Sequence, residues 1–396
     1  MLTLIGWTLI GSSVLAGSYP AFESVFLKDK HKRRKLIAEL HKAFFHGDFF
    51  KKINNKPIYP SLLKIDQQER RQSFVFSVPK GMNPEEFTNR VYVFKQHFGQ
   101  YITLEVNEQR GILQVYTKGL PSEFIYNYIN IQKYMQGMKL PIVCGRNLDG
   151  ETFLFDLAKH PHILISGETG SGKSSEIRSI VTTLIQTKPA TQLRFVLGDL
   201  KRSEFHLFKT MKHVDGVYHT ASELLPALKK IKKEMSKRGD LLDEAGVNSI
   251  YDLKEKLSSI IVCIDEVVLL KKETDIMDIL EEISSIGRSL GVFIILSMQR
   301  PDAKLLDGKL KVNLTVRMGF QTADATNSKI IGTPGAEKLN TPGRMILKIN
   351  SSLQEIQCPW LENDMARKLL QTFKREEVLQ EPVQEDEYST VRRLLH

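Results

Sequence analysis

Short apolar runs recur along the second half of the chain, and segments with apolar positions at helical spacing lie between them. The runs occupy residues 163–165, 193–197, 260–264 and 293–296 and are rich in Ile, Leu and Val, as is typical of strands buried on both faces. Strands that alternate with helices predict an α/β fold, with a largely parallel sheet covered by helices on both faces. We assign this domain to residues 140–373. Ligands of such sheets bind at the carboxyl ends of the strands.

A different pattern predicts a small α+β domain at residues 71–139. Residues 73–78 alternate between apolar and polar like a strand, residues 84–98 are helical, and residues 101–106 and 111–117 form a strand pair. Aromatic residues on one face of the helix are better explained as core than as platforms for nucleotide stacking. This segment carries no catalytic constellation.

The N-terminal segment is apolar and ends in a basic cluster. Residues 2–22 contain no charged side chain, and residues 28–35 are mostly basic. The apolar length can cross a bilayer as one helix, and the basic cluster would keep the rest of the chain in the cytoplasm. We expect a transmembrane segment at 1–27, then a basic juxtamembrane helix and linker at 28–70, with 54–60 as linker. An oligomerising core helix or a helix lying on the membrane surface are the alternatives.

The composition of the chain says more about its binding partners than about its fold. Of 396 residues, 41% are hydrophobic and 26% are charged, ordinary values for a folded protein. The formal net charge of +10 favours an anionic partner, nucleic acid or membrane headgroups, without choosing between them. Cys144, Cys263 and Cys358 lack metal-binding spacing and suit a reducing cytoplasm. The charged tail at 374–396 is expected to be solvated or partly disordered.

The segment from Gly167 to Ser174 reads Gly-Glu-Thr-Gly-Ser-Gly-Lys-Ser, and it lies between a predicted strand and a predicted helix. This is the phosphate-binding loop pattern in the context that it requires. Backbone N–H groups would surround the phosphates, Lys173 would reach the β- and γ-phosphates, and the Ser174 hydroxyl would ligate Mg²⁺. The prediction is a P-loop NTPase that uses ATP and Mg²⁺. Its nucleotide-binding residues would be Gly167, Glu168, Thr169, Gly170, Ser171, Gly172, Lys173, Ser174 and Ser175.

Two carboxylates, Asp265 and Glu266, follow the apolar run 260–264. Asp265 would hold Mg²⁺ together with Ser174, and Glu266 would orient or deprotonate the attacking water. These roles require carboxylates beside the phosphates, and the carboxyl end of a parallel strand brings them there.

Further candidates also follow predicted strands. Asp199, Lys201 and Glu204 follow the run 193–197, and Gln299 follows 293–296, from where its amide could sense the γ-phosphate. Two arginines could reach a neighbouring subunit's nucleotide or form ordinary surface ion pairs. These arginines are Arg288 and Arg317. The predicted catalytic set is Glu266, Lys173, Gln299 and Arg317.

An ordered series of motifs resembles the FtsK/SpoIIIE/HerA family of DNA-translocating ATPases over roughly residues 140–347. The pieces lie before, between and after the two nucleotide motifs, in the family's order. They are Asp156–His162, Gly198–Glu204, Asp265-Glu266, Gly287–Val292, Ser297–Pro301, Val316–Phe320 and Gly335–Leu339. The resemblance implies a RecA/HerA-like fold and a ring, expected to be a hexamer, with ATP between subunits and DNA in the central pore. An arginine from the neighbour, with Arg317 the first choice, would stabilise the transferring phosphoryl.

The departures from the family pattern refine this prediction. Thr326-Asn327-Ser328-Lys329 stands where the family commonly has Asp-Ser-Arg, and we expect no winged-helix domain after residue 347. A compact motor with one or two membrane spans is more similar to the coupling proteins of Gram-positive conjugative plasmids and integrated elements. The resemblance therefore implies a membrane-anchored ATPase that passes DNA, independently of its sequence, to a conjugation channel with a relaxase.

Several alternatives stay open at this point. A chromosome-segregation translocase belongs to the same family, and a secretion ATPase to the same superfamily, although secretion ATPases usually carry several motors in tandem. The intact Lys173 and Glu266 argue against a non-catalytic ring scaffold on a membrane. Lys201, Arg202 and residues 304–311 are possible DNA contacts, although a solvated face explains any single lysine as well.

Overall fold

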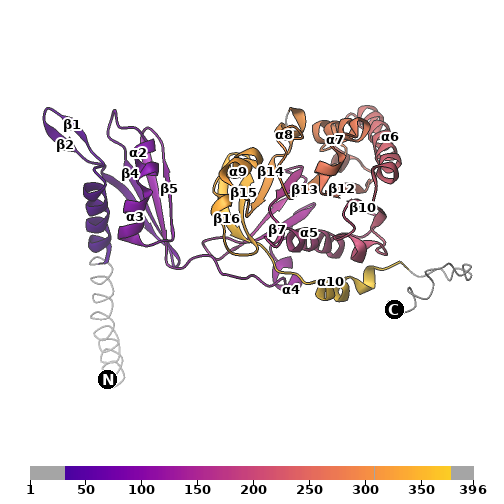
Figure 1. The fold of residues 1–396 in the computed structure, drawn as a ribbon, viewed down its shortest axis with the longest axis horizontal. Coiled ribbons are helices and arrows are strands. Elements are labelled where there is room, and N and C mark those ends of the chain that lie inside the picture. Colours follow the sequence, from indigo (N-terminus) through magenta and orange to yellow (C-terminus); the bar gives the residue numbers. More distant parts are fainter. Residues whose placement is uncertain (1–31, 307, 376–396) are drawn as a thin grey trace, which may run out of the picture. The chain divides into compact units, whose positions relative to one another are not determined.

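The computed structural model describes residues 32–306 and 308–375. The chain divides into two compact units (Figure 1). The first contains the described residues up to Gly119 together with Leu148–Gly150, and the second contains Leu120–Asn147 and the described residues from Glu151 onward. The predicted transmembrane segment and nearly all of the charged tail lie outside the described residues. Among the described helices, none combines the length and apolar character needed to span a bilayer.

The first unit contains a four-stranded antiparallel sheet in the order β3-β4-β6-β5. Three of its strands match the predicted ones, whereas β3 lies in the segment 28–70 that was predicted as a juxtamembrane helix and linker, and residues 32–46 form a further helix. The elements are β3 (Leu62–Gln67), β4 (Arg71–Ser77), α2 (Glu85–Asn89), α3 (Val91–Phe98), β5 (Ile102–Val106) and β6 (Arg110–Tyr116). The core is aromatic, with Phe49 stacked on Phe87 at a centroid distance of 4.6 Å.

Further details of this unit also differ from the sequence prediction. Residues 54–60, predicted as a linker, contribute to a hairpin of β1 (Lys51–Ile53) and β2 (Lys56–Ile58). Asn54 and Asn55 turn it with φ of 50° and 61°, the left-handed pair that a two-residue hairpin loop requires and that asparagine tolerates. The predicted helix 84–98 is two helices, because the backbone leaves helical geometry at Arg90.

The second unit is built on a ten-stranded sheet whose larger part is parallel. The order is β11-β10-β12-β13-β9-β14-β15-β16-β7-β8. Neighbouring strands run parallel from β11 to β14. The parallel strands are β9 (Ile163–Ser166), β10 (Leu193–Asp199), β11 (Val214–Tyr218), β12 (Ser259–Asp265), β13 (Val292–Met298) and β14 (Val316–Phe320). All four strands predicted for this domain are therefore present and lie in one sheet.

The sheet continues beyond β14 with antiparallel strands, so that it is mixed. These strands are β15 (Arg344–Ile349), β16 (Ser352–Gln357), β7 (Pro141–Arg146) and β8 (Thr152–Asp156). The sequence pattern did not distinguish this part, because apolar runs reveal burial and not strand direction.

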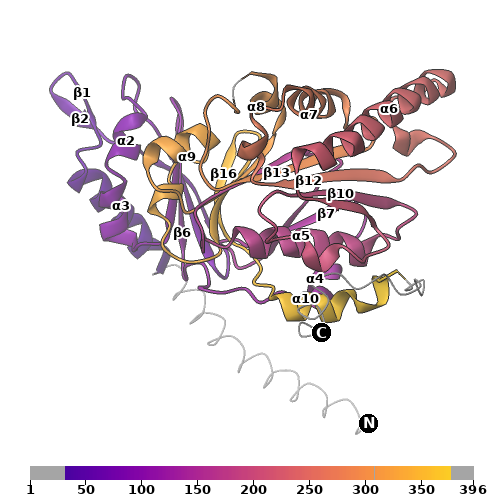
Figure 2. The ribbon, with the colours of Figure 1, turned by 45° about the vertical axis from the view of Figure 1, so that its right-hand side comes forward.

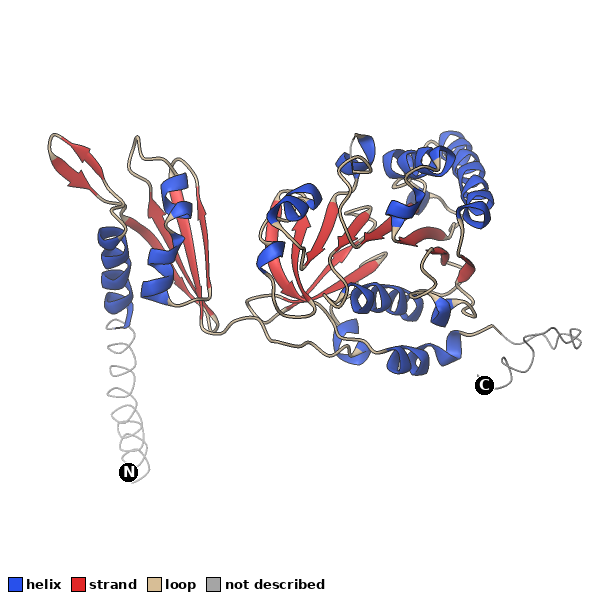
Figure 3. Ribbon diagram, in the orientation of Figure 1, coloured by secondary structure: helices blue, strands red, loops and turns tan. Residues whose placement is uncertain are grey.

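Helices cover both faces of the sheet, as predicted (Figures 2 and 3). Helix α5 (Lys173–Thr187) and α10 (Asn363–Leu370) lie on one face, and α6 (Ala221–Ala245) and α7 (Thr274–Ile286) lie on the other. Strand β12 shows the reason, since Ile261 and Cys263 pack into one apolar core while Ile260, Val262 and Ile264 pack into the other. The remaining helical segments are short. They are α4 (Tyr128–Gln132), α8 (Lys309–Asn313), α9 (Ala325–Ile331), and the 3₁₀ turns His206–Phe208, Ile250–Asp252, Val267–Leu270, Ala336–Lys338 and Gln371–Phe373.

Candidate active site

The phosphate-binding loop connects β9 to α5, as the sequence predicted. Gly172 precedes the first residue of α5 and has φ of 111°, a conformation that L side chains rarely adopt. A Cβ at this position would lie 2.6 Å from the Cα of Gly343, so a close backbone approach also requires glycine. The loop thus delivers the backbone N–H groups at the start of α5 toward the cavity in front of it.

Neighbouring segments fix the shape of this loop. The Glu168 N–H donates to the Gln321 carbonyl at 2.8 Å, and the Gly343 N–H donates to the Ser171 carbonyl at 2.8 Å. Within the loop, the Ser171 hydroxyl donates to the Glu168 carbonyl at 2.7 Å. Backbone hydrogen bonds to the segments next to β14 and β15 thus hold the loop in this conformation.

A cavity of about 410 Å³ opens in front of the loop, a volume suited to a nucleotide-sized ligand. It is lined by Glu168, Thr169, Gly170, Gly172, Lys173, Ser174, Ser175, Arg178, Lys201, Ser203, Glu204, Asp265, Gln299 and Trp360. Most of the predicted nucleotide-binding residues are therefore on one wall. Gly167 and Ser171 do not line it, and Ser171 instead stabilises the loop from inside.

Lys173 is buried at the base of this cavity. Burial lowers its pKa, and the carboxylates of Asp265, Glu266 and Glu204 act in the opposite direction. An anionic phosphate at this point would add to the carboxylates' effect and favour the charged ammonium. Lys173 is thus placed to bind a negatively charged group, as predicted from the motif.

The proposed metal ligands Ser174 and Asp265 line the same cavity. The Ser174 hydroxyl donates its proton to a Glu204 carboxylate oxygen, which leaves the oxygen lone pairs available to a cation. Burial raises the pKa of Glu204, and the hydrogen bond from Ser174 opposes that shift. A hydroxyl and a carboxylate are the hard oxygen donors that Mg²⁺ takes while it keeps several waters, so these residues fit the ion.

Glu266 lies directly after β12 with φ of 54°, a left-handed conformation that is uncommon for a residue other than glycine. Its side chain is buried. Lys201 Nζ lies 2.7 Å from Glu266 Oε2, and the Gln299 N–H donates to the carboxylate at 3.3 Å. Glu266 is not among the lining residues, but both of its partners are. Two residues of the cavity wall thus hold the Glu266 carboxylate.

The two arginines considered for a role in a neighbouring subunit lie elsewhere. Arg317 donates to the backbone carbonyls of Lys311, Leu314 and Ile331 in its own chain. Arg288 is exposed and lines a different cavity. An arginine that acts in trans has no reason to lie near its own chain's site, so both assignments stay predictions.

Three lining residues were missed by the sequence analysis, Arg178, Ser203 and Trp360. Arg178 follows Ser174 by one helical turn on α5, so helical spacing could have identified it. Trp360 follows β16, about 190 positions beyond the loop, and nothing in the local sequence indicates that the fold brings it there.

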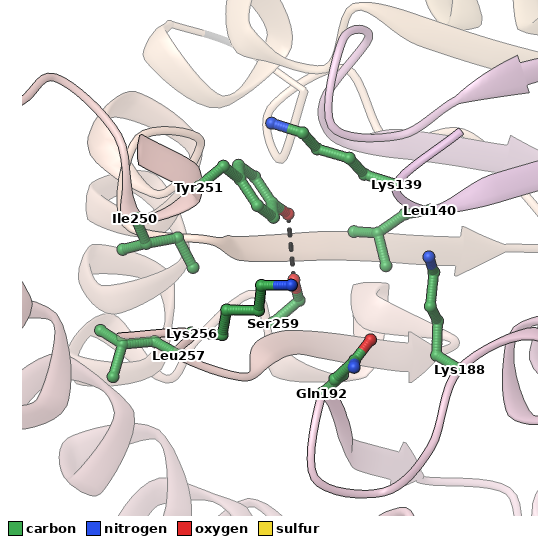
Figure 4. Close-up of a pocket in the computed structure, with 9 residues that line it drawn as sticks. All are labelled: Lys139, Leu140, Lys188, Gln192, Ile250, Tyr251, Lys256, Leu257 and Ser259. Atoms are coloured by element: carbon green, nitrogen blue, oxygen red, sulfur yellow. Dashed lines mark hydrogen bonds between the residues drawn. The ribbon is translucent and has the colours of Figure 1, made fainter. Parts of the chain in front are cut away.

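A second cavity, of about 240 Å³, lies at the opposite edge of the sheet, where Ser259 begins β12 (Figure 4). The hydroxyls of Tyr251 and Ser259 are 2.9 Å apart, and the Lys139 ammonium lies 3.9 Å from the centroid of the Tyr251 ring. Burial raises the pKa of Tyr251 to about 12. This cavity shares no lining residue with the first, so the two cavities are separate.

Comparison with known proteins agrees with this geometry. The sequence model of the FtsK/SpoIIIE family matches residues 131–318. The DNA translocase FtsK of Chlorobaculum tepidum is 30% identical over 254 residues, which are 59% of this chain and 32% of that protein. The DNA translocase FtsK of Chlamydia trachomatis is 33% identical over 237 residues, 54% of this chain and 30% of that protein. This chain thus spans about a third of the length of these relatives.

Two solved structures share the fold. The pCW3 conjugation coupling protein TcpA, in a monomer form with ATPγS, has a TM-score of 0.60 at 24% identity, covering 86% of this chain and 100% of that one. The cytoplasmic domain of the Thermomonospora curvata type VII secretion ATPase EccC has a TM-score of 0.54 at 25% identity, and the match covers 60% of this chain and 31% of that one. The fold and the cavity define a P-loop ATPase that uses ATP. Residues 131–318 form a domain that matches the FtsK/SpoIIIE family, as the motif series predicted.

Proposed function

We propose that this chain is a membrane-anchored, ATP-driven DNA translocase that feeds DNA to a conjugative transfer channel. The observation that carries the motor assignment is the single cavity shared by Lys173, Ser174 and Asp265, with Glu266 held beside it. The relatives named DNA translocases support DNA as the substrate. The shared fold along the whole TcpA chain supports the conjugative role.

Each residue of the cavity has a definite part in this mechanism. The backbone N–H groups of the loop bind the phosphates, and Lys173 neutralises the β- and γ-phosphates. Ser174 and Asp265 would hold Mg²⁺, which supplies charge neutralisation to the phosphate oxygens. Glu266 accepts a proton from the attacking water, or orients that water, as a general base. The side-chain amide of Gln299 senses the γ-phosphate by hydrogen bonding to it.

We propose that the motor acts as a ring, with a hexamer the expected form and DNA in its pore. An arginine of the neighbouring subunit, Arg317 or Arg288, would stabilise the transferring phosphoryl group. Contacts to phosphates rather than bases give a grip that does not depend on sequence and that weakens with salt. A relaxase and channel proteins would be the partners in transfer, and the N-terminal segment would anchor the chain in the cell membrane.

DNA-dependent ATP hydrolysis by the full chain, purified in detergent, tests the motor assignment. Added DNA of unrelated sequences should raise the hydrolysis rate several-fold, and the stimulation should fall steeply with salt. Lys173→Ala should abolish hydrolysis, while the exposed Lys237→Ala should retain it. A hydrolysis rate that DNA leaves unchanged, in a chain that remains monomeric, would contradict the assignment.

A secretion motor is the second candidate, because the fold also matches the secretion ATPase EccC. Stimulation of hydrolysis by a peptide and not by DNA would favour that function. The cellular pathway needs a genetic test. Loss of element transfer in a Lys173→Ala strain indicates conjugation, whereas a defect in chromosome segregation indicates the alternative within the family. Membrane fractionation of the full chain tests the proposed anchor, which predicts recovery in the membrane fraction.

A further inference from the structure

An exposed tryptophan forms part of the wall of the nucleotide cavity. Trp360 is 45% exposed and lines the cavity together with Gly172, Ser175 and Arg178. It lies beyond the segment that matches the family model. A large apolar ring that remains in water beside a polar cavity is informative, because tryptophan side chains are usually highly buried.

The chain around Trp360 is fixed to the helix that follows the phosphate-binding loop. The Ser175 hydroxyl donates to the Pro359 carbonyl and accepts from the Leu361 N–H, both at 2.9 Å. Arg178 Nη1 donates to the Leu361 carbonyl at 2.6 Å. Ser175 and Arg178 belong to the first turns of α5, which begins directly after the phosphate-binding loop. The position of Trp360 is thus set relative to the phosphate site by three hydrogen bonds.

A second segment holds the backbone of Trp360 from another side. The Trp360 N–H donates to the Phe124 carbonyl at 2.7 Å, and the Tyr126 N–H donates to the Trp360 carbonyl at 2.9 Å. The indole N–H donates to a Glu362 carboxylate oxygen at 3.4 Å. Both backbone groups and the polar edge of the ring therefore have partners within the chain. What Trp360 leaves available to a ligand is its apolar ring.

We propose that Trp360 is the base-binding surface of the nucleotide site, on which the purine of ATP stacks. This inference rests on the proposed use of ATP at this cavity. The loop and Lys173 fix the phosphates at one end, and Asp265 and Gln299 occupy the side where hydrolysis takes place. Beside Ser175 and Arg178, the apolar ring of Trp360 is available to the base, at the other end of the nucleotide. Stacking on a ring already held in place loses little conformational entropy.

Tryptophan emission provides a direct test. The chain contains two tryptophans, Trp7 and Trp360, so Trp7→Phe makes Trp360 the reporter in the full chain. ADP and ATPγS should quench its emission, because the base contacts the indole. Tripolyphosphate, which has the phosphates and no base, should compete with ADP and leave the emission nearly unchanged. Equal quenching by tripolyphosphate, or ADP binding detected by calorimetry without quenching, would overturn the proposal.

Substitutions at Trp360 separate stacking from a structural role. Trp360→Ala should weaken ADP binding by about thirtyfold, the middle of the range for base–aromatic stacking, and Trp360→Phe should retain most of the affinity. Tripolyphosphate should bind both variants as it binds the parent. If Trp360→Ala weakens tripolyphosphate equally, or alters self-association and not ADP affinity, Trp360 supports the fold or an interface. Failure of the proposed ATPase would look different, because the parent itself would then bind neither ADP nor tripolyphosphate.

Discussion

Glu266 shows how a single residue can indicate function through its conformation. Its φ of 54° and ψ of 54° place a glutamate in the left-handed region, which has an energetic cost of about 1–2 kcal/mol for such a residue. The surrounding contacts hold it there, since Lys201 and the Gln299 N–H both contact its carboxylate. Strained backbone conformations of this kind are common at functional sites. The geometry therefore supports the catalytic role that the sequence predicted for it.

Glu266→Gln should lower ATP hydrolysis by at least about a hundredfold, because the amide cannot accept the proton of the attacking water. ATP binding should remain, since Glu266 does not line the cavity. The exposed Glu244→Gln serves as the control and should hydrolyse ATP like the parent. Single-turnover hydrolysis and ATPγS affinity measure the two quantities. Parallel losses of binding and hydrolysis would show that Glu266 holds the nucleotide instead.

Glu176, in the first turn of α5, gives a prediction about pH. Its side chain is buried, and among the described residues neither carboxylate oxygen has a hydrogen-bond partner. Burial raises its pKa well above the usual value. Above about pH 4.3, where a free glutamate ionises, the unfolded chain loses this proton and the folded chain keeps it. Glu176 therefore lowers the stability of the folded state increasingly as pH rises toward its folded pKa.

Glu176→Gln removes this ionisation from the unfolded chain. The stability difference between the variant and the parent should therefore shift in favour of the variant between pH 5 and pH 8. Denaturant unfolding at several pH values measures it, with the exposed Glu255→Gln as the control. A difference that stays constant across this range would mean that Glu176 is ionised in the folded protein.

At the scale of elements, one buried arginine of α6 forms hydrogen bonds with the segments that lead into the sheet. Arg238 donates to the Leu290 carbonyl at 2.6 Å, to the Ser258 carbonyl at 2.8 Å and to Glu234 at 2.6 Å. Leu290 and Ser258 lie just before β13 and β12. One side chain thus connects the helix to the segments that enter two central strands, one of which ends at Asp265.

Arg238→Ala should lower the free energy of unfolding by about 2 kcal/mol, because it leaves two backbone carbonyls without this partner and removes one of the two arginines that contact the half-buried Glu234 carboxylate. Lys237→Ala, at the exposed neighbouring position, should change it by less than about 0.5 kcal/mol. Denaturant unfolding of the Trp7→Phe chain, followed by Trp360 emission, reports on this unit. Equal stabilities of the two variants would show that packing of α6 suffices without the arginine.

The elements also show what the sequence can predict. Strands β9, β10, β12 and β13 and the loop before α5 were predictable, because burial and phosphate binding leave local patterns. The antiparallel strands β15 and β16 were not, since direction and partner depend on contacts distant in sequence. The Asn54-Asn55 pair is typical of a two-residue hairpin turn, and the prediction of a linker did not take this into account.

At the scale of the whole molecule, the site also combines residues that local motifs predict with residues that only the fold brings there. Lys173, Ser174, Asp265 and Glu266 belong to two local motifs, and the parallel sheet brings them to one edge as expected. Trp360 belongs to no motif and reaches the cavity only because its segment binds Ser175 and Arg178 on α5. The catalytic and phosphate-binding residues thus come from local motifs, whereas the remaining wall of the cavity depends on the complete fold.

The central claim is that ATP hydrolysis at this edge of the sheet moves DNA. Displacement of a third strand from a triplex at the end of a DNA duplex measures such movement directly. The full chain should displace it with ATP, irrespective of duplex sequence, and Lys173→Ala and Glu266→Gln should not. Rapid ATP hydrolysis that leaves the third strand in place would contradict the claim.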